Sequence, residues 1–252
     1  MPPPSSIRYP ELDLLRSLAV LLMIVYHAAY DLSAFADADI DVFSGWWLIL
    51  ARSTAVLFLL IVGISFSISW HRSASYSKYL RRGVILIFLS MIVTVVTLIF
   101  DPSTYVRFGI LHLIGISILL LPFFSRFGII NGLIGCMWIA IGLIIKNKTI
   151  GTSLLIPIGL TPSTFQTIDY FPLFPWFGVV LMGYAIGLVT YVRGPLGRNR
   201  SSNDNACLTI LTFPGRYALL IYLAHQPVLT GIMKFVLYIL RYSSGPRVED
   251  AL

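Results

Sequence analysis

The chain has 252 residues, of which 57% are hydrophobic and only 12% are charged. Soluble domains have roughly a quarter of their residues charged, so this composition excludes an ordinary soluble protein and indicates a polytopic membrane protein. The formal net charge of +7 does not indicate nucleic-acid binding, because no Lys/Arg-rich stretch is interleaved with aromatic residues.

Seven stretches are apolar and long enough to cross a bilayer, whose hydrocarbon core takes about 20 residues of helix. They cover residues 12–34, 46–70, 81–100, 108–124, 128–146, 172–191 and 216–240. Residues 149–171 are too rich in glycine and proline to span, so we expect an interfacial or re-entrant loop there. The sequence therefore predicts an all-α integral membrane bundle of about seven transmembrane helices, in a single domain over residues 1–252.

Charged residues in the loops predict the orientation of this bundle. Basic residues gather on one side: Arg8, Arg72, Lys78, Arg81, Arg82, Arg126, Arg193, Arg198 and Arg200. The other side has Asp37, Asp39, Asp41, Asp101 and Asp169 against Arg107, Lys146 and Lys148. Because cytoplasmic loops carry an excess of Lys and Arg, we expect a plasma-membrane protein with its N-terminus inside and its C-terminus outside.

The first span carries four ionisable residues on one face. At 100° per residue, Asp13, Arg16, His27 and Asp31 fall inside an arc of about 60°. Ionisable groups at membrane depth are costly and usually face a cavity or a partner. The i,i+3 spacing of Asp13 and Arg16 predicts an ion pair at the cytoplasmic end, whereas for His27 and Asp31 we favour a functional site over a packing hydrogen bond.

Further polar residues lie within or beside the other spans: Arg52, Arg107, His112, Asp169, His225 and Gln226. Each histidine alone is at least as well explained as a buried structural residue. Taken together with the unbalanced Arg52, they predict a polar cavity.

Two further features of the spans are an aromatic residue and a pair of small residues. Trp176, at the entry of the sixth span, is equally consistent with a wall of the polar cavity and with an aromatic belt at the membrane interface. Gly63 and Ser67 have the small-xxx-small spacing that favours close helix packing over ligand binding.

Five segments resemble a known family in sequence and in order. They are PELDLLRSLAVLLMIVYHAAYDL, ARSTAVLFLLIVGISFS, FGILHLIGISILL, DYFPLFPWFGVVLMG and GRYALLIYLAHQPVL. Together they resemble the prokaryotic membrane proteins grouped with heparan-α-glucosaminide N-acetyltransferase, over essentially the whole chain. The resemblance implies a transmembrane acyltransferase that moves an acyl group from cytoplasmic acetyl-CoA or another acyl-CoA to an acceptor on the far side. In the lysosomal enzyme this acceptor is the terminal glucosamine of heparan sulfate, so the resemblance implies an amino sugar or glycan here.

The chain departs from the family pattern at two positions of the first span. The lysosomal enzyme aligns an asparagine with His27 and has its catalytic histidine just after the first helix, whereas residues 32–51 contain no histidine here. Either His27 takes that role from inside the helix, or this branch works differently. Ser17 stands where relatives usually have glycine, a change that we expect only to widen a packing contact.

These residues give a mechanistic hypothesis. Acyl transfer needs a base for the incoming nucleophile and a donor for the developing oxyanion. His27 would be the base or a transient acyl carrier, Asp31 would fix its tautomer, and Arg52 would balance Asp31 or face the oxyanion. The other substrate-binding candidates are Arg107, His112, Asp169, Trp176, His225 and Gln226. The candidates for the CoA phosphates, equally explained as topology determinants, are Arg16, Arg72, Arg81 and Arg82.

The same polar residues are also consistent with other classes of membrane protein. A proton-coupled transporter or lipid-handling protein is the main alternative, since intramembrane His and Asp can relay protons. A zinc hydrolase is disfavoured because no H-x-x-x-H spacing is present, so we expect no metal. A homo-oligomer is compatible with the sequence, although no span carries a motif that dictates one.

Overall fold

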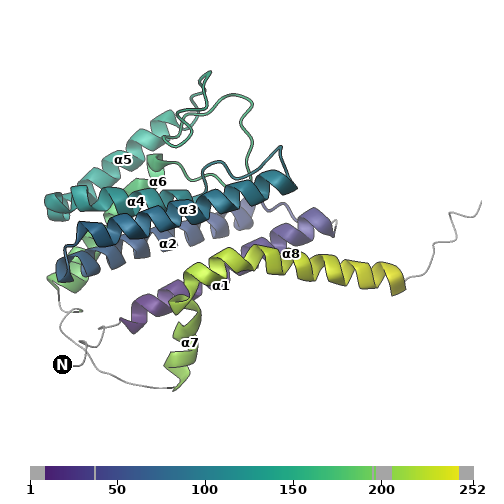
Figure 1. Ribbon diagram of the computed structural model, residues 1–252, viewed down its shortest axis with the longest axis horizontal. Helices are drawn as coiled ribbons and strands as arrows, with labels where there is room; N and C mark the ends of the chain where they lie inside the picture. The colour runs from purple at the N-terminus through teal and green to yellow at the C-terminus, as the bar shows by residue number, and fades with distance from the viewer. Residues whose placement is uncertain (1–8, 37, 195, 197–205, 244–252) are drawn as a thin grey trace, which may run out of the picture. The chain divides into compact units, whose positions relative to one another are not determined.

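The computed structural model describes residues 9–36, 38–194, 196 and 206–243, and among these residues the regular structure is entirely helical (Figure 1). The helices are α1 (Pro10–Phe35), α2 (Gly45–Arg72), α3 (Tyr76–Phe100), α4 (Ile110–Phe124), η1 (Ser125–Ile130), α5 (Asn131–Ile145), α6 (Leu173–Gly187), η2 (Leu188–Val192), α7 (Ala206–Arg216) and α8 (Ala218–Ser243). The all-α prediction is confirmed. Four of the loop charges used above, Arg8, Asp37, Arg198 and Arg200, lie outside the described residues.

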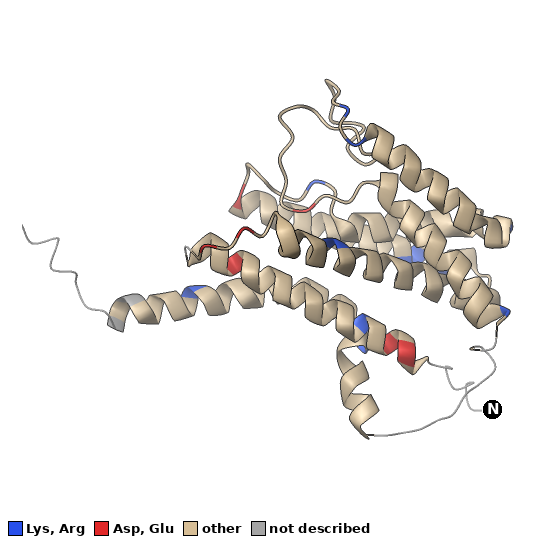
Figure 2. Cartoon of the chain, turned by 180° about the vertical axis from the view of Figure 1, so that it is seen from behind, with Lys and Arg blue, Asp and Glu red and all other residues tan. Residues whose placement is uncertain are grey.

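Six helical stretches are long and apolar enough to cross a membrane. The fourth, Ile110–Ile145, comprises α4 and α5 with a break at Gly128, whose φ is +54°. The seven predicted spans therefore correspond to α1–α6 and α8. Large apolar side chains such as Phe88, Phe100 and Phe235 are exposed, and Figure 2 shows long stretches of helix without charged residues. Such surfaces suit lipid and not water, and the prediction of a multi-pass membrane protein is confirmed.

One helix was not predicted. Residues 206–216 form α7, which apart from Arg216 lies outside the seven predicted spans. The 11 residues of α7 are too few to span a bilayer and include Pro214, so a search for long apolar runs passes over them.

The described chain separates into two compact units, each treated by itself below. The terminal unit comprises residues 9–57 and 206–243, and in it α1 packs against α7 and α8 (Figure 1). The central unit comprises residues 58–194, and in it α5 packs along α6 and α3 along α4. The boundary falls within α2. The single domain over residues 1–252 stays a prediction.

Glycines bring the helices of the central unit close together. A Cβ at Gly63 of α2 would lie 2.1 Å from the carbonyl oxygen of Val180 of α6. A Cβ at Gly178 of α6 would lie 2.5 Å from the carbonyl oxygen of Gly135 of α5. Ser67, one turn after Gly63, is fully buried. The close packing predicted for the second span is therefore confirmed.

The segment between α5 and α6 contains no helix among its described residues, as predicted for 149–171. Backbone hydrogen bonds attach it to the segment between α3 and α4. Ile168 N–H donates to the carbonyl of Thr104 at 2.8 Å, and Phe171 N–H donates to the carbonyl of Phe108 at 2.9 Å. The two connections therefore form one layer beside the start of α4.

Candidate functional site

A buried carboxylate joins the first and last helices of the terminal unit. Asp31 of α1 is 0% exposed and accepts hydrogen bonds from two side chains of α8. Gln226 Nε2 donates to Oδ1 at 2.7 Å, and Thr230 Oγ1 donates to Oδ2 at 3.2 Å. Burying an ionisable group is tolerable only with such partners. The C-terminal end of the polar face of α1 is therefore directed at α8.

The amide of Gln226 is oriented by this carboxylate. Because a carboxylate oxygen accepts, the amide nitrogen of Gln226 must face Asp31, and the amide oxygen must face away. Gln226 Oε1 is buried and has no hydrogen-bond partner among the described residues. The contact thus leaves one buried acceptor unsatisfied.

His225, the preceding residue of α8, has a defined tautomer. Its Nδ1 lies 2.6 Å from the carbonyl oxygen of Tyr222. A carbonyl can only accept, so Nδ1 carries the proton and the neutral ring has its lone pair on Nε2. That nitrogen is buried and also lacks a partner within the described part of the chain. His225 and Gln226 therefore each present an unfilled acceptor.

His27 of α1 lies against His225. The two ring centroids are 4.7 Å apart and the rings meet edge to face. His27 has no hydrogen bond in the described structure, so the expected hydrogen bond from a ring N–H of His27 to Asp31, which would fix the tautomer of His27, is not formed. The structure brings together His27, Asp31, His225 and Gln226 of the predicted site residues, with Asp31 bonded to α8 instead of His27.

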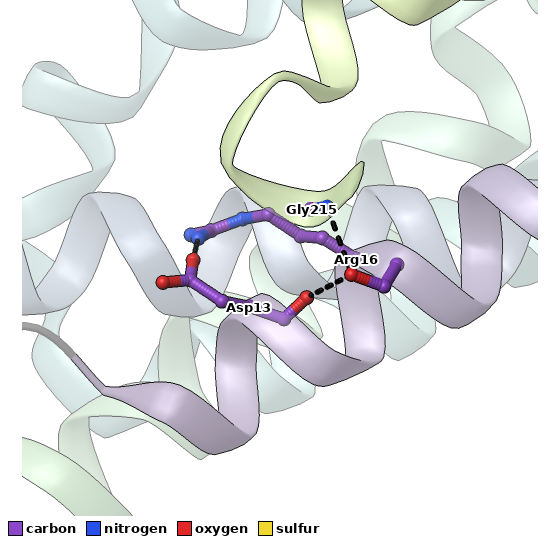
Figure 3. Close-up of polar contacts among 4 residues, drawn as sticks. Asp13, Arg16 and Gly215 are labelled. Atoms are coloured by element: carbon purple, nitrogen blue, oxygen red, sulfur yellow. Dashed lines mark hydrogen bonds and ion pairs between the residues drawn. The ribbon is translucent and has the colours of Figure 1, made fainter. Parts of the chain in front are cut away.

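The other end of α1 is held by α7. Asp13 forms an ion pair with Arg16, as the i,i+3 spacing predicted (Figure 3). Gly215 N–H donates to Ser17 Oγ at 2.8 Å, and Ser17 Oγ donates to the carbonyl of Asp13 at 3.0 Å. Ser17 therefore does more than widen a packing contact, because its hydroxyl joins two helices. A Cβ at Gly215 would lie 2.0 Å from that same carbonyl oxygen, so only glycine fits.

His112, in the central unit, has partners on both ring nitrogens. Gly109 N–H donates to Nδ1 at 3.3 Å, so the proton lies on Nε2, which is 3.4 Å from Thr94 Oγ1. Residues 109 and 112 thus form a cap on the first turn of α4. A role for His112 in binding substrate stays a prediction, and it would require one of these bonds to open.

Asp169 lies against the same helix end. Its Oδ2 accepts the N–H of Ile110 at 3.1 Å, and a Cβ at Gly109 would lie 2.1 Å from this oxygen. Burial raises the pKa of Asp169 to about 6, although the hydrogen bond from Ile110 works in the opposite direction. Asp169 therefore attaches the loop after α5 to the N-terminus of α4.

Two other substrate-binding candidates of the central unit lie among aromatic rings. The Arg107 guanidinium is 4.9 Å from the Tyr105 ring centroid and 5.3 Å from that of Phe165, and its Nε is buried without a partner among the described residues. The Trp176 ring lies 4.8 Å from that of Phe171. No ion pair joins Arg107 to Asp169 in the described structure.

The remaining cationic candidates differ in their surroundings. Arg52 of α2 is exposed and forms no ion pair with Asp31 in the described part of the terminal unit. Arg16 is paired with Asp13. Arg72, Arg81 and Arg82 are exposed around the connection between α2 and α3. A role for these three residues and for Arg16 in binding the CoA phosphates stays a prediction.

Thr230 is the site residue that the sequence analysis missed. It lies four residues after Gln226, so both side chains share one face of α8. That spacing was the available signal, but a threonine on a membrane helix commonly bonds its own backbone. The structure directs it to Asp31 instead. Within the described residues no group of three or more His, Cys, Asp or Glu side chains could hold a metal ion.

Comparisons with known proteins identify the family. The model of the family described as heparan-alpha-glucosaminide N-acetyltransferase, catalytic, matches residues 8–227, which include α1 to α7 and the part of α8 that carries His225 and Gln226. No curated protein and no solved structure matches the chain. The family and the apolar helices together indicate a membrane acetyltransferase. The chain belongs to the heparan-alpha-glucosaminide N-acetyltransferase catalytic family.

Proposed function

We propose that this protein uses cytoplasmic acetyl-CoA or another acyl-CoA to acylate an amino sugar or glycan on the extracytoplasmic side of the plasma membrane. One observation carries the proposal. Two imidazoles, a carboxylate and an amide, from helices far apart in the sequence, meet inside the terminal unit. Polar groups are expensive among membrane helices and usually serve a function there.

At the acyl carbon, the reaction would form one bond and break another. The nitrogen or oxygen of the acceptor bonds to the acyl carbon, the carbon–sulfur bond breaks, and the CoA thiolate leaves and takes up a proton. His27 would remove the proton from the acceptor, or carry the acyl group between the two substrates. Its ring has no hydrogen bond in the described structure and lies against His225, so a nitrogen of His27 is available for either role.

Asp31 would act through α8. Its carboxylate holds Gln226 and Thr230 and so fixes the surface that α8 presents next to His27. This role replaces the direct contact between Asp31 and His27 in the original hypothesis.

The donor would approach the basic side. Arg72, Arg81 and Arg82 are exposed and cationic, as binding of the CoA phosphates requires. Arg16 would first have to leave Asp13. The excess of basic residues on this side supports a cytoplasmic N-terminus and an extracytoplasmic C-terminus.

Release of free thiol from acetyl-CoA by the purified protein, with a panel of amino sugars and glycans as acceptors, tests the proposal. We expect acceptor-dependent thiol release that falls by about 10²–10⁴-fold in His27→Ala, the range for loss of a general base. His71→Ala is the control, because it removes an exposed imidazole whose Nδ1 is bonded to the backbone carbonyl of Ser67. Parental turnover in His27→Ala would contradict the assignment.

Reconstitution of the purified protein into vesicles distinguishes an enzyme from a transporter. Reconstituted vesicles that take up sugar in response to a pH gradient, without consuming acetyl-CoA, would favour the proton-coupled transporter instead.

A further inference from the structure

We infer that Arg107 binds the phosphate of a membrane phospholipid through the two terminal nitrogens of its guanidinium. Arg107 lies in the layer formed by residues 101–109 and 146–172, the connections from α3 to α4 and from α5 to α6, here called the connecting layer. This role goes beyond acyl transfer and does not depend on it.

Two aromatic rings hold the guanidinium in one orientation. Its central carbon lies 4.9 Å from the ring centroid of Tyr105 and 5.3 Å from that of Phe165, so each of the two connections contributes one ring. The Thr167 hydroxyl donates to the carbonyl of Tyr105 at 2.8 Å and ties these connections together. The Phe165 ring packs in turn against that of Tyr170, at 4.9 Å. Such contacts restrict the rotamers of the arginine, so less conformational entropy is lost when a ligand binds.

The terminal nitrogens of Arg107 have no partner in the described chain. Nε is buried without a hydrogen bond, whereas Nη1 and Nη2 are accessible and form neither a hydrogen bond nor an ion pair with the described residues. The guanidinium is planar, so its two terminal N–H groups point in the same direction and can reach two oxygens of one anion. One side chain therefore provides both donors of the site.

The connecting layer offers Arg107 no counter-ion of its own. Its two carboxylates are Asp101 and Asp169. Asp101 accepts hydrogen bonds from side chains of its own turn, and Asp169 accepts the N–H of Ile110. Neither forms an ion pair with Arg107 in the described part of the chain. A half-buried cation without a counter-ion is costly, so an anion from outside the chain is the expected partner.

The position of Arg107 favours a lipid over a soluble anion. Arg107 lies three residues before α4, which opens an apolar stretch, Ile110–Ile145, long enough to cross a membrane. Spans end at the level of the headgroups, where phospholipid phosphates lie. The connecting layer also exposes the large apolar side chains of Leu154, Ile158 and Ile168. Acyl chains would cover these side chains, whereas a soluble anion would leave them in water.

Lipid binding to the full chain in detergent tests the site. Native mass spectrometry would measure the apparent Kd of the first bound phosphatidylglycerol, and diacylglycerol would supply the same acyl chains without the phosphate. We expect phosphatidylglycerol to bind at least about tenfold more tightly, the effect of hydrogen bonds between charged groups. Glycerol 3-phosphate, which has the phosphate but no acyl chains, should bind at least about tenfold more weakly than phosphatidylglycerol.

Substitution of Arg107 is the sharpest variant. Arg107→Gln should raise the Kd for phosphatidylglycerol at least about tenfold and leave that for diacylglycerol unchanged. Lys148→Gln is the matched control, because Lys148 is an exposed cation of the same layer without an ion pair or a stacked ring in the described structure, and it should change neither Kd. Arg107→Lys keeps the charge but has one nitrogen in place of the planar pair, so it should restore only part of the affinity.

Substitution of Phe165 tests the contribution of the rings with every charge in place. Phe165→Leu should raise the Kd for phosphatidylglycerol about threefold, the effect of one lost cation–π contact. Phe171→Leu is the control, because the Phe171 ring packs against Trp176 and not against Arg107. A merely destabilised layer would lower the melting temperature and weaken both lipids, so the ratio of the two Kd values is the deciding measurement.

Equal affinities for phosphatidylglycerol and diacylglycerol would overturn the inference, as would parental affinity in Arg107→Gln. Full affinity in Arg107→Lys would show attraction to charge alone and remove the contact through two nitrogens. Glycerol 3-phosphate binding as tightly as phosphatidylglycerol would assign the site to a soluble phosphate instead of a lipid. Displacement of the lipid by a sulfated disaccharide would return Arg107 to the predicted role in binding substrate.

Discussion

Asp31 in the terminal unit and Asp169 in the central unit are both shielded carboxylates, and they are used differently. Asp169 accepts a backbone N–H at the start of α4 and fills the space beside Gly109. Among the described residues, Asp31 accepts hydrogen bonds only from side chains, those of Gln226 and Thr230. A carboxylate bonded to backbone fixes the path of the chain, whereas one bonded to side chains fixes what those side chains present. We therefore propose that Asp31 prepares a site and that Asp169 fixes the path of the chain, while the predicted role of Asp169 in binding substrate stays a prediction.

The histidines of the two units repeat this contrast. His112 has a partner on each nitrogen, and both partners belong to its own helix end and the neighbouring α3. His225 has a partner on Nδ1 and an unfilled lone pair on Nε2. Burial of a histidine therefore does not identify function, but an unsatisfied buried nitrogen does point to a ligand.

Replacing Asp31 or Asp169 should produce the largest difference in turnover between the two units. Asp31→Leu leaves the Gln226 amide and the Thr230 hydroxyl without an acceptor, so we expect a loss of about 1–3 kcal/mol of stability. Because Gln226 would no longer be oriented, acceptor-dependent thiol release per folded protein should fall at least tenfold. Asp169→Leu should lower the melting temperature without lowering the turnover of the protein that remains folded. Equal losses of turnover in both variants would break the comparison.

Asp169 should also make stability depend on pH, with a defined sign. Its pKa is about 6 in the folded protein, above the ordinary value of 3.8, so the folded state prefers the neutral acid. The stabilisation is fully present below pH 3.8 and is lost as the pH rises through about 6. Two pKa units correspond to at most about 3 kcal/mol. Asp169→Asn keeps an oxygen for Ile110 and stays neutral, so thermal unfolding across this pH range should lose that slope.

Asp101 provides the control for this titration. Hydrogen bonds from Ser103 and Thr104 lower the pKa of Asp101 to about 2, so it is ionised throughout the range in which Asp169 titrates. Asp101→Asn should leave the slope between pH 4 and 6 as it is. A flat profile in the parent protein would show that the Asp169 carboxylate is not shielded from water.

Replacing a close-packed glycine should destabilise the two units by similar amounts, whereas replacing their carboxylates should affect turnover differently. Gly215→Ala would place a methyl group 2.0 Å from the carbonyl oxygen of Asp13, and Gly178→Ala would place one 2.5 Å from that of Gly135. We expect each to cost about 1–3 kcal/mol, measured by chemical or thermal unfolding in detergent. Gly231→Ala has nothing within 4 Å of the new methyl group and should be neutral or slightly stabilising.

The smallest effect should come from Ser17. Ser17→Ala removes the acceptor of the Gly215 N–H, a contact between α1 and α7 that should contribute about 1 kcal/mol. Thr190→Ala, at a hydroxyl that bonds only its own helix, is the matched control. Loss of stability in the control alone would remove the special role of Ser17.

Most of the helices and one ion pair could be predicted from the sequence. Long apolar runs identified seven of the helices, because the bilayer thickness sets a minimum length that such runs meet. The single arc of polar residues on α1 predicted that one face has partners, and the Asp13–Arg16 ion pair followed from its spacing. The short helix α7 was missed because the length criterion does not apply to it.

The amino-acid sequence by itself determined the membrane class, the family and the set of polar residues available for chemistry, since these depend on composition, on periodicity along single helices and on motifs in order. Only the tertiary structure decided that Asp31 pairs with Gln226 and Thr230 and not with His27. It also decided that His112 is satisfied while His225 is not. The physical reason is that a hydrogen-bond partner is set by distance and direction in space, and residues 31 and 226 are neighbours only after α1 and α8 have packed.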